Sequence, residues 1–241
     1  MIPPARLRAA AASTWPPRRI LPLGPVTLRD GGGGGSRVGA ATVDGTWTGA
    51  DLDAAAAAMR DLGQPPLFMV RAGEGALDCA LAARGYAVRD PVVVRAAPPG
   101  PVAARDLPPG SVIECDRPVA AQVEIWAAGG IGAARRAVMD RAPAPKTALL
   151  GRVGDLPAGA AHLALSDGIA VLHALEVAGG ARRRGLARAM MTGAARWAQR
   201  HGAEALAILV TRANDPANAL YDGLGMGIVD AYHYRVAGPA A

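Results

Sequence analysis

The residues that could do chemistry gather at two turns where an apolar run passes into a helix. The first turn is Arg182-Arg183-Arg184-Gly185-Leu186-Ala187, which follows the branched apolar run 169–177. The run predicts a buried strand, and the apolar stripe after it predicts a helix from Arg183 to Gly202. The first turn of a helix presents unpaired N–H groups and the positive end of its dipole. This turn therefore predicts a phosphate-binding site, although arginines on a helix are often only solvated.

The second turn follows the apolar run 204–211, a second predicted strand. Asn214 suits a helix N-cap and Pro216 suits the first helical turn. Tyr221 comes seven residues after Asn214, on the same predicted helix. A polar cap and a tyrosine are thus expected close to the end of the second strand.

The two turns together resemble the signatures of the GCN5-related N-acetyltransferase (GNAT) family. The first signature is an arginine, a glycine and a small residue after a strand, matched by Arg182, Gly185 and Ala187. The second is matched by Asn214, Leu220, Tyr221, Leu224 and Gly225. Met226 stands where the family usually has phenylalanine, so one large apolar residue is replaced by another.

The resemblance implies an α/β fold with a mixed sheet and acetyl-CoA as cofactor. In the family, the pantetheine arm pairs with the backbone of a strand, here Leu175 to Val177, and the pyrophosphate binds the amides of the arginine-glycine turn. The cofactor-binding residues that the resemblance predicts are Leu175, Glu176, Val177, Arg182, Arg183, Arg184, Gly185, Leu186, Ala187, Asn214, Ala217 and Tyr221.

The predicted reaction transfers an acetyl group directly to a primary amine of a small molecule or peptide. By resemblance, Tyr221 protonates the departing thiolate; the alternative is a packing role. Glu176 is the predicted base. His173 could be a base or a core histidine, but strand alternation predicts that it and Glu176 face opposite ways. Glu124 is a further candidate. A regulatory protein that binds acyl-CoA without turnover is the alternative function.

Composition limits the other function classes. The net charge of +6 favours an anionic ligand, but no basic patch interleaved with aromatic residues supports nucleic-acid binding. No uncharged apolar run reaches the ~18 residues of a membrane span, and no hydrophobic signal core opens the chain. Two cysteines, expected as buried thiols, have no metal-ligand spacing, so we predict no metal and a cytoplasmic protein of unknown oligomeric state.

The chain divides at the Pro/Gly-rich segment 98–110, a predicted linker. Residues 1–14 are expected to be a disordered tail, 15–97 a first unit and 111–241 the catalytic GNAT domain. The first unit is expected to contain a strand over 36–43 and a helix over 50–62. Its strand-helix-strand end, 65–97, repeats the order of 204–236, which suggests a degenerate, catalytically inactive half of a GNAT fold. Trp15-Pro16, Arg29 and Arg37 give a weaker resemblance to bacterial tandem GNAT proteins.

Overall fold

A computed structural model describes residues 2–238, which form two compact units. The major unit runs to Trp15 and takes in Val94–Val210 and Asn214–Val229. The minor unit takes in Pro16–Val93, Thr211–Ala213 and the chain from Asp230. Each unit is therefore assembled from segments that are distant in the sequence.

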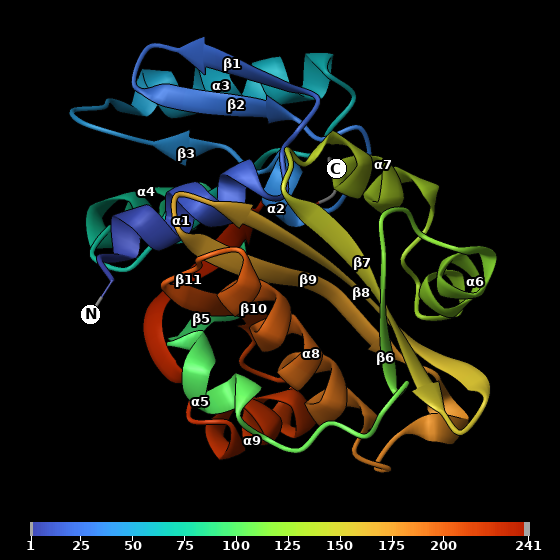
Figure 1. Ribbon diagram of the computed structural model, residues 1–241. Coiled ribbons are helices and arrows are strands. Elements are labelled where there is room, and N and C mark those ends of the chain that lie inside the picture. The colour runs from blue at the N-terminus through green and yellow to red at the C-terminus, as the bar shows by residue number, and fades with distance from the viewer. Residues whose placement is uncertain (1, 239–241) are drawn as a thin grey trace. The chain divides into compact units, whose positions relative to one another are not determined.

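The major unit is built on a mixed sheet (Figure 1). Its antiparallel strands are β6 (Val112–Cys115), β7 (Lys146–Val153), β8 (Leu156–Ser166) and β9 (Ile169–Val177). The next strand, β10 (Ala205–Thr211), is parallel to β9. The predicted α/β class with a mixed sheet is confirmed.

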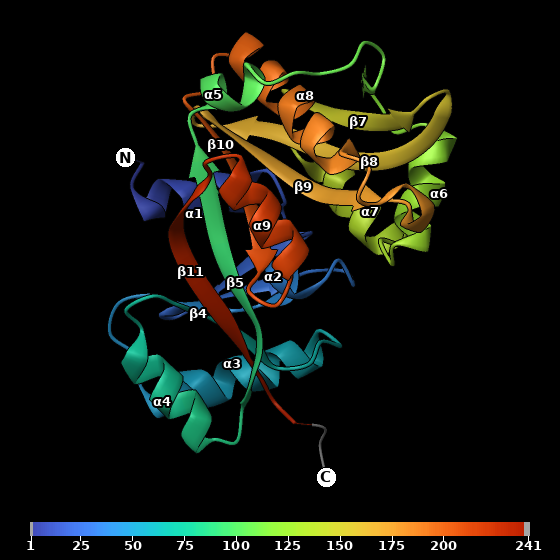
Figure 2. The ribbon, with the colours of Figure 1, turned by 90° about the horizontal axis from the view of Figure 1, so that it is seen from below.

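Helices cover both faces of strands β7 to β9 (Figure 2). One face carries α8 (Leu186–Arg200) and α5 (Pro99–Ala103), and the other carries α6 (Ala120–Ala128) and α7 (Ala133–Arg141). Close packing of α8 depends on glycine in the strands beneath it, because a Cβ at Gly159 would lie 2.5 Å from Met190 Sδ. The predicted helix between β9 and β10 therefore lies flat on the sheet.

The first residues form a packed helix, which corrects the prediction of a disordered tail over 1–14. Helix α1 (Pro4–Ser13) buries Leu7 and Ala10 against Ile169, Val171 and other residues of β9 and β10. Arg6 forms an ion pair with Asp167 at 2.9 Å. The Pro/Ala/Arg composition suggested disorder, but alanine is the best helix former, and Leu7 and Ala10 lie on one helical stripe.

Two further predictions need correction. The segment 98–110 is not a bare linker, because α5 buries Val102 and packs against α8, and Arg196 donates to the carbonyl of Ala103 at 3.1 Å. The expected strand over 36–43 is instead a short helix, α2 (Ser36–Gly39), followed by β3 (Thr42–Val43). Gly35, at φ +101°, turns the chain into that helix.

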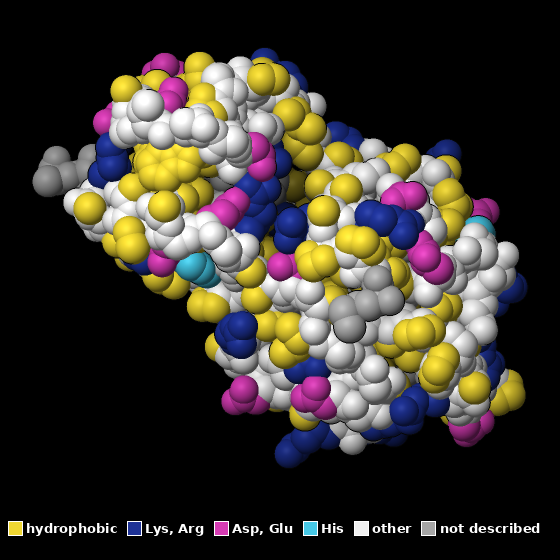
Figure 3. Space-filling view, turned by 90° about the vertical axis from the view of Figure 1, so that its left-hand side faces the viewer, with side chains coloured by type: hydrophobic (Ala, Val, Ile, Leu, Met, Phe, Trp, Pro, Cys, Tyr) yellow, Lys and Arg dark blue, Asp and Glu magenta, His cyan; other side chains and the backbone are white. Residues whose placement is uncertain are grey.

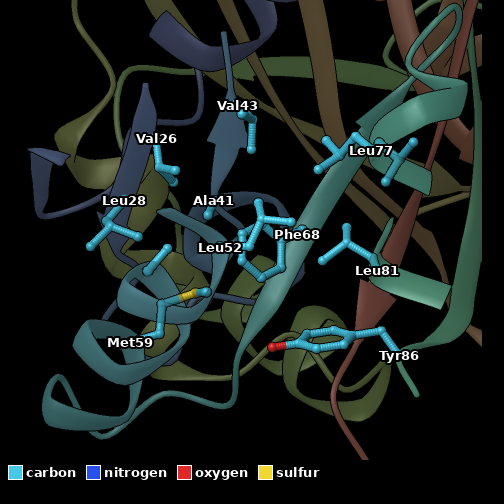
Figure 4. Packing of buried hydrophobic residues seen from close by; sticks show 12 residues of the cluster. Val26, Leu28, Ala41, Val43, Leu52, Met59, Phe68, Leu77, Leu81 and Tyr86 are labelled. Carbon is cyan, nitrogen blue, oxygen red and sulfur yellow. The ribbon is translucent and has the colours of Figure 1, made fainter. Parts of the chain in front are cut away.

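The minor unit has its own core (Figure 4). The hairpin β1 (Arg19–Leu23) and β2 (Val26–Asp30) joins β3, and the helices are α3 (Gly49–Asp61) and α4 (Gly75–Ala83). Side chains from these elements meet around Phe68 of β4 (Leu67–Arg71), which contacts the Tyr86 ring edge-on at a centroid distance of 5.7 Å. Helix α3 starts with a reciprocal capping box between Thr48 and Asp51.

The last elements of the two halves of the sequence have the same order. The first set is β4, α4 and β5 (Ala87–Ala97), and the second is β10, α9 (Asp215–Gly223) and β11 (Gly227–Val236). Hydrogen bonding gives the strand order β4-β11-β5-β10-β9-β8-β7-β6. In this order β4, the first strand of the first set, lies beside β11, the final strand of the second set. Likewise β10, the first strand of the second set, lies beside β5, the final strand of the first set.

The packing of α1 predicts a measurable loss of stability in Leu7→Ala. Removing this buried side chain should lower the free energy of unfolding by about 2–4 kcal/mol. The matched control is Leu156→Ala, whose leucine is 73% exposed and should cost less than about 0.5 kcal/mol. Urea denaturation measures both. A cost for Leu7→Ala no greater than for the control would mean that the first residues do not pack on the sheet.

Candidate functional site

The two parallel strands of the major unit separate part-way along their length. Residues Ala205 to Ile208 of β10 pair with Ile169 to Leu172 of β9, and the pairing stops there. On its other side β9 stays paired with β8 as far as Val177. Residues 173–177 therefore have no described strand on the β10 side. Leu175, Glu176 and Val177, predicted to pair with a ligand through their backbone, lie in this stretch.

A β-bulge reshapes β9 just where the strands separate. His173 is opposite His162, and Glu176 is opposite Ala160, so β9 has one residue more than β8 over this interval. The backbone of Ala174, at φ +52°, accommodates the extra residue. Trp126 of α6 donates from Nε1 to the Ala174 carbonyl at 2.8 Å. The extra residue resets the alternation. His173 and Glu176 consequently share a face, and the prediction that they face opposite ways is wrong.

Glu176 is held on the α6 side of the sheet. Its carboxylate accepts a hydrogen bond from Arg182 at 3.0 Å, and Arg182 also donates to the carbonyl of Val177 at 3.1 Å. The carboxylate lies against Gly129, where a Cβ would be 2.6 Å from Glu176 Cδ. Arg182 is thus tied to the end of β9, and the absence of a side chain at Gly129 leaves room for the carboxylate.

The arginine-glycine turn presents free backbone donors. After the short 3₁₀ turn Gly179–Ala181, Arg183 and Gly185 have φ values of +59° and +82°. Such residues cannot continue a helix, so α8 begins at Leu186 and not at Arg183 as predicted. No side chain caps it, and the amides of Gly185 to Arg188 donate to no acceptor in the part of the chain that the structure describes.

This geometry fits an anion. Left-handed residues in the turn before a helix can point neighbouring amides into one concavity, and the helix dipole adds positive potential. A Cβ at Gly185 would meet no atom within 4 Å, so the space over the turn is open. Arg183 and Arg184 are exposed beside it, while Leu186 is buried and anchors the helix. The amides and the two arginines are what a pyrophosphate requires.

Helix α9 carries the other predicted residues. Asn214 is its N-cap and accepts from the amide of Ala217 at 3.2 Å, so this pair fixes the start of the helix. Tyr221 is 4% exposed, and among the described residues its hydroxyl has no hydrogen-bond partner. Burial raises the pKa of Tyr221, against the opposing effect of the Arg95 cation. Tyr221 is therefore a neutral phenol at physiological pH, with a proton to donate.

Two histidines lie beneath the end of α1. His173 shares a 2.8 Å hydrogen bond with Thr14 Oγ1, and Trp15 packs on its ring at a centroid distance of 5.0 Å. His162 is 4% exposed, and its Nε2 has no partner among the residues described. Burial, with a smaller contribution from Lys146, lowers the pKa of His162 to about 4. These contacts fit the core role that the sequence left open for His173.

Sequence reasoning missed Arg95 and His162. Arg95 interrupts the apolar run of β5, and a lone arginine in such a run signals a buried charge with partners. His162 gave no such signal, and Trp15, whose ring lies 6.4 Å from it between centroids, is far away in the sequence. Cys79 is exposed, not buried as expected, and Cys115 is partly exposed; both are free thiols.

The minor unit has a cavity of about 320 Å³ whose lining includes Arg71, Asp78 and His233. Its charges are paired internally, since Arg71 forms an ion pair with Glu74 and Asp78 accepts from His233 at 2.7 Å.

On the face shown in Figure 3, basic and acidic side chains are interspersed. No helix between residues 2 and 238 combines the length and apolar character that a bilayer span requires.

A model of the Acetyltransferase (GNAT) family matches residues 122–226. That range contains the separation of β9 from β10, the arginine-glycine turn and Tyr221. These findings support the GNAT acetyltransferase family. The matched range is less than half of the chain and shows a likeness to this family, whose proteins are N-acyltransferases that generally bind acetyl-CoA. No protein of curated function matches the chain.

Solved structures support the same fold over nearly the whole chain. A GCN5-related N-acetyltransferase from Kribbella flavida is 20% identical, with a TM-score of 0.73 over 98% of this chain and 96% of that one. A functionally unknown conserved protein from Staphylococcus epidermidis is 9% identical, with a TM-score of 0.69 and coverages of 94% and 96%. A tandem GNAT protein from the clavulanic acid biosynthesis pathway is 16% identical, with a TM-score of 0.60 and coverages of 90% and 79%. At these identities the likeness shows the GNAT fold.

The buried His162 predicts an acid-sensitive fold. Because its pKa is about 4 in the folded protein and near 6.5 when unfolded, stability is full above pH 6.5 and falls as the pH approaches 4. The loss from this group is at most about 3 kcal/mol. His162→Gln and His162→Leu should both flatten that part of the profile in urea denaturation at successive pH values. Variants with the wild-type slope between pH 6.5 and 4 would contradict the assignment.

Proposed function

We propose that the protein is an acetyl-CoA-dependent N-acetyltransferase that transfers the acetyl group directly to a primary amine. The observation that carries the proposal is the free edge of β9 over residues 173–177, which leads into the unpaired amides of Gly185 to Arg188. An extended amide chain with a pyrophosphate at one end is the kind of ligand that such an arrangement suits.

The donor site uses mainly backbone groups. Leu175 to Val177 would pair with the amides of the pantetheine arm, and the amides from Gly185 onward would hold the pyrophosphate. Arg183 and Arg184 would add charge from the surface of the turn. Asn214 and Ala217 support the site indirectly, because their hydrogen bond fixes the start of α9. Arg182 positions Glu176 through the 3.0 Å ion pair and ties it to the end of β9.

The chemistry needs one proton removed and one supplied. Acetyl-CoA supplies an activated acetyl thioester when bound. The amine must be neutral to attack, so its proton is released to a base, and we assign Glu176 this role because it is half-buried on the α6 side. Tyr221 supplies a proton to the departing sulfur from its neutral hydroxyl. The two transfers balance, since the amine loses one proton and the thiol gains one.

The acceptor is proposed to be a small-molecule or peptide amine. The mixed charge on the face in Figure 3 gives no support to nucleic acid as a partner. We propose a cytoplasmic location, where acetyl-CoA is available and thiols such as Cys79 and Cys115 stay reduced. Residues 111–241 are proposed to hold both signature turns of the catalytic domain, and residues 15–97 to have no donor site of their own.

We also propose that the first unit is a degenerate half of a GNAT fold. The matching element order β4-α4-β5 and β10-α9-β11 supports a duplication, and the strand order β4-β11-β5-β10, in which each final strand lies beside the other set's first strand, supports an exchange of the final strands. Leu81 of α4 corresponds approximately to Tyr221 of α9 when the two helices are matched from their first residues. It is fully buried in the minor-unit core (Figure 4). This half would therefore lack the acid.

Isothermal titration with acetyl-CoA tests the donor site. Gly185→Glu places a carboxylate over the free amides and should weaken binding by roughly 10-fold or more. The matched control is Gly202→Glu at the other end of α8, because Gly202 also has a left-handed φ, +70°, and open space around it. The control should keep the wild-type affinity while bearing the same charge and similar backbone strain.

The same proteins should then be screened against a panel of amines for release of the free thiol. Equal affinity in Gly185→Glu, Gly202→Glu and the wild type would contradict the proposed donor site. Acetyl-CoA binding without thiol release for any amine would instead favour a regulatory acyl-CoA-binding protein.

A further inference from the structure

A buried arginine from the first half of the sequence reaches the helix that carries Tyr221. Arg95 lies near the end of β5, and Val94 to Ala97 belong to the major unit together with α9. Arg95 is 5% exposed, although its guanidinium is a cation. Burying a guanidinium is costly unless it is paired and hydrogen-bonded, so the partners of Arg95 reveal what the charge does.

All three partners of Arg95 come from α9 or the turn after it. It donates to Asn218 Oδ1 at 3.1 Å, to the carboxylate of Asp222, and to the main-chain carbonyl of Met226 at 3.0 Å. Asn218 and Asp222 are one turn apart, so the guanidinium bridges successive turns of the helix. Tyr221 lies between them in the sequence.

These contacts restrict the helix in two ways. A planar guanidinium with three fixed acceptors sets both the rotation of α9 about its axis and its position along that axis. Rotation of the helix would turn the Tyr221 hydroxyl away from the place that the proposed function gives it, because the phenol is a long side chain and its hydroxyl has no described partner to hold it. The Arg95 cation also opposes the effect of burial on the pKa of Tyr221, which places the two groups within electrostatic reach.

We propose that Arg95 is a positioning residue that holds α9 so that the Tyr221 hydroxyl faces the departing sulfur. This inference rests on the proposed function, in which Tyr221 is the acid. It implies that the first half of the sequence completes the catalytic geometry through the end of β5, outside residues 111–241. Arg95 touches neither substrate, and it acts only through α9.

The first test is a double-mutant cycle on turnover, with hydroxylamine as a small neutral acceptor and the uncatalysed rate subtracted. Arg95→Met and Tyr221→Phe should each lower kcat by roughly 10- to 100-fold, and the double variant should be no slower than the worse single variant. The acetyl-CoA dissociation constant should stay within about threefold of wild type. Arg95→Lys should recover part of kcat, since it restores the charge but not the fork of donors.

The matched control is Arg105→Met. Arg105 donates to the carbonyl of Gly223, at the end of the same helix, at 2.8 Å, but it makes no described bond beside Tyr221. Its kcat should equal that of the wild type. Losses in Arg95→Met and Tyr221→Phe that multiply in the double variant, or an equal loss in Arg105→Met, would overturn a role through Tyr221. A wild-type rate in Tyr221→Phe would also overturn it, while leaving acetyl transfer itself intact.

A second measurement does not depend on turnover. The chain has four tyrosines, so fluorotyrosine labelling gives few ¹⁹F resonances, and the Tyr221 signal is the one lost in Tyr221→Phe. Acetyl-CoA should shift this signal in the wild type and in Arg95→Lys, but not in Arg95→Met. The same shift in Arg95→Met would contradict the inference. Absence of acetyl-CoA binding by the wild type in titration would instead identify a failure of the proposed function.

Discussion

The site depends on one constraint: β9 must stay hydrogen-bonded to β8 along one edge while the end of its other edge stays unpaired. Pairing with β8 continues to Val177, while pairing with β10 ends at Leu172. Unpaired backbone groups are costly when they are buried, so such an edge persists only where the rest of the fold supports it. The bulge at Ala174 provides part of that support, because Trp126 satisfies its carbonyl and packs α6 against the strand.

The rest of the major unit supports the two sides of this opening from segments far apart in the sequence. Helix α1 packs on the paired half of β9 and β10. Gly159 lets α8 lie close to the sheet, which places the free amides of the Gly185 turn directly after β9. Arg95 of β5 holds α9 from the other side. A chain cut at the sequence boundary before residue 111 would lose both α1 and Arg95.

Much of this could be predicted from the sequence, because the strongest signals are local. The strands and helices from residue 146 to 236 follow from apolar periodicity, and the Gly185 turn and the Asn214 cap follow from residue types at fixed spacing. What could not be predicted depends on tertiary contacts. An alternating pattern does not reveal the bulge at Ala174. The composition of α1 suggests a disordered tail, and only the packing of Leu7 on the sheet shows that it is a helix of the core. The partners of Arg95 lie over a hundred residues away in the sequence.

Hydrogen-deuterium exchange with and without saturating acetyl-CoA tests most directly whether the free edge and the free amides are the donor site. In the free protein the amides of Gly185 to Arg188 should exchange quickly, since they donate to no described acceptor. Adding acetyl-CoA should slow exchange in peptides that cover 173–177 and 185–188, and leave those of the β1–β2 hairpin unchanged. Unchanged exchange at 185–188, with protection appearing only in the minor unit, would contradict the account.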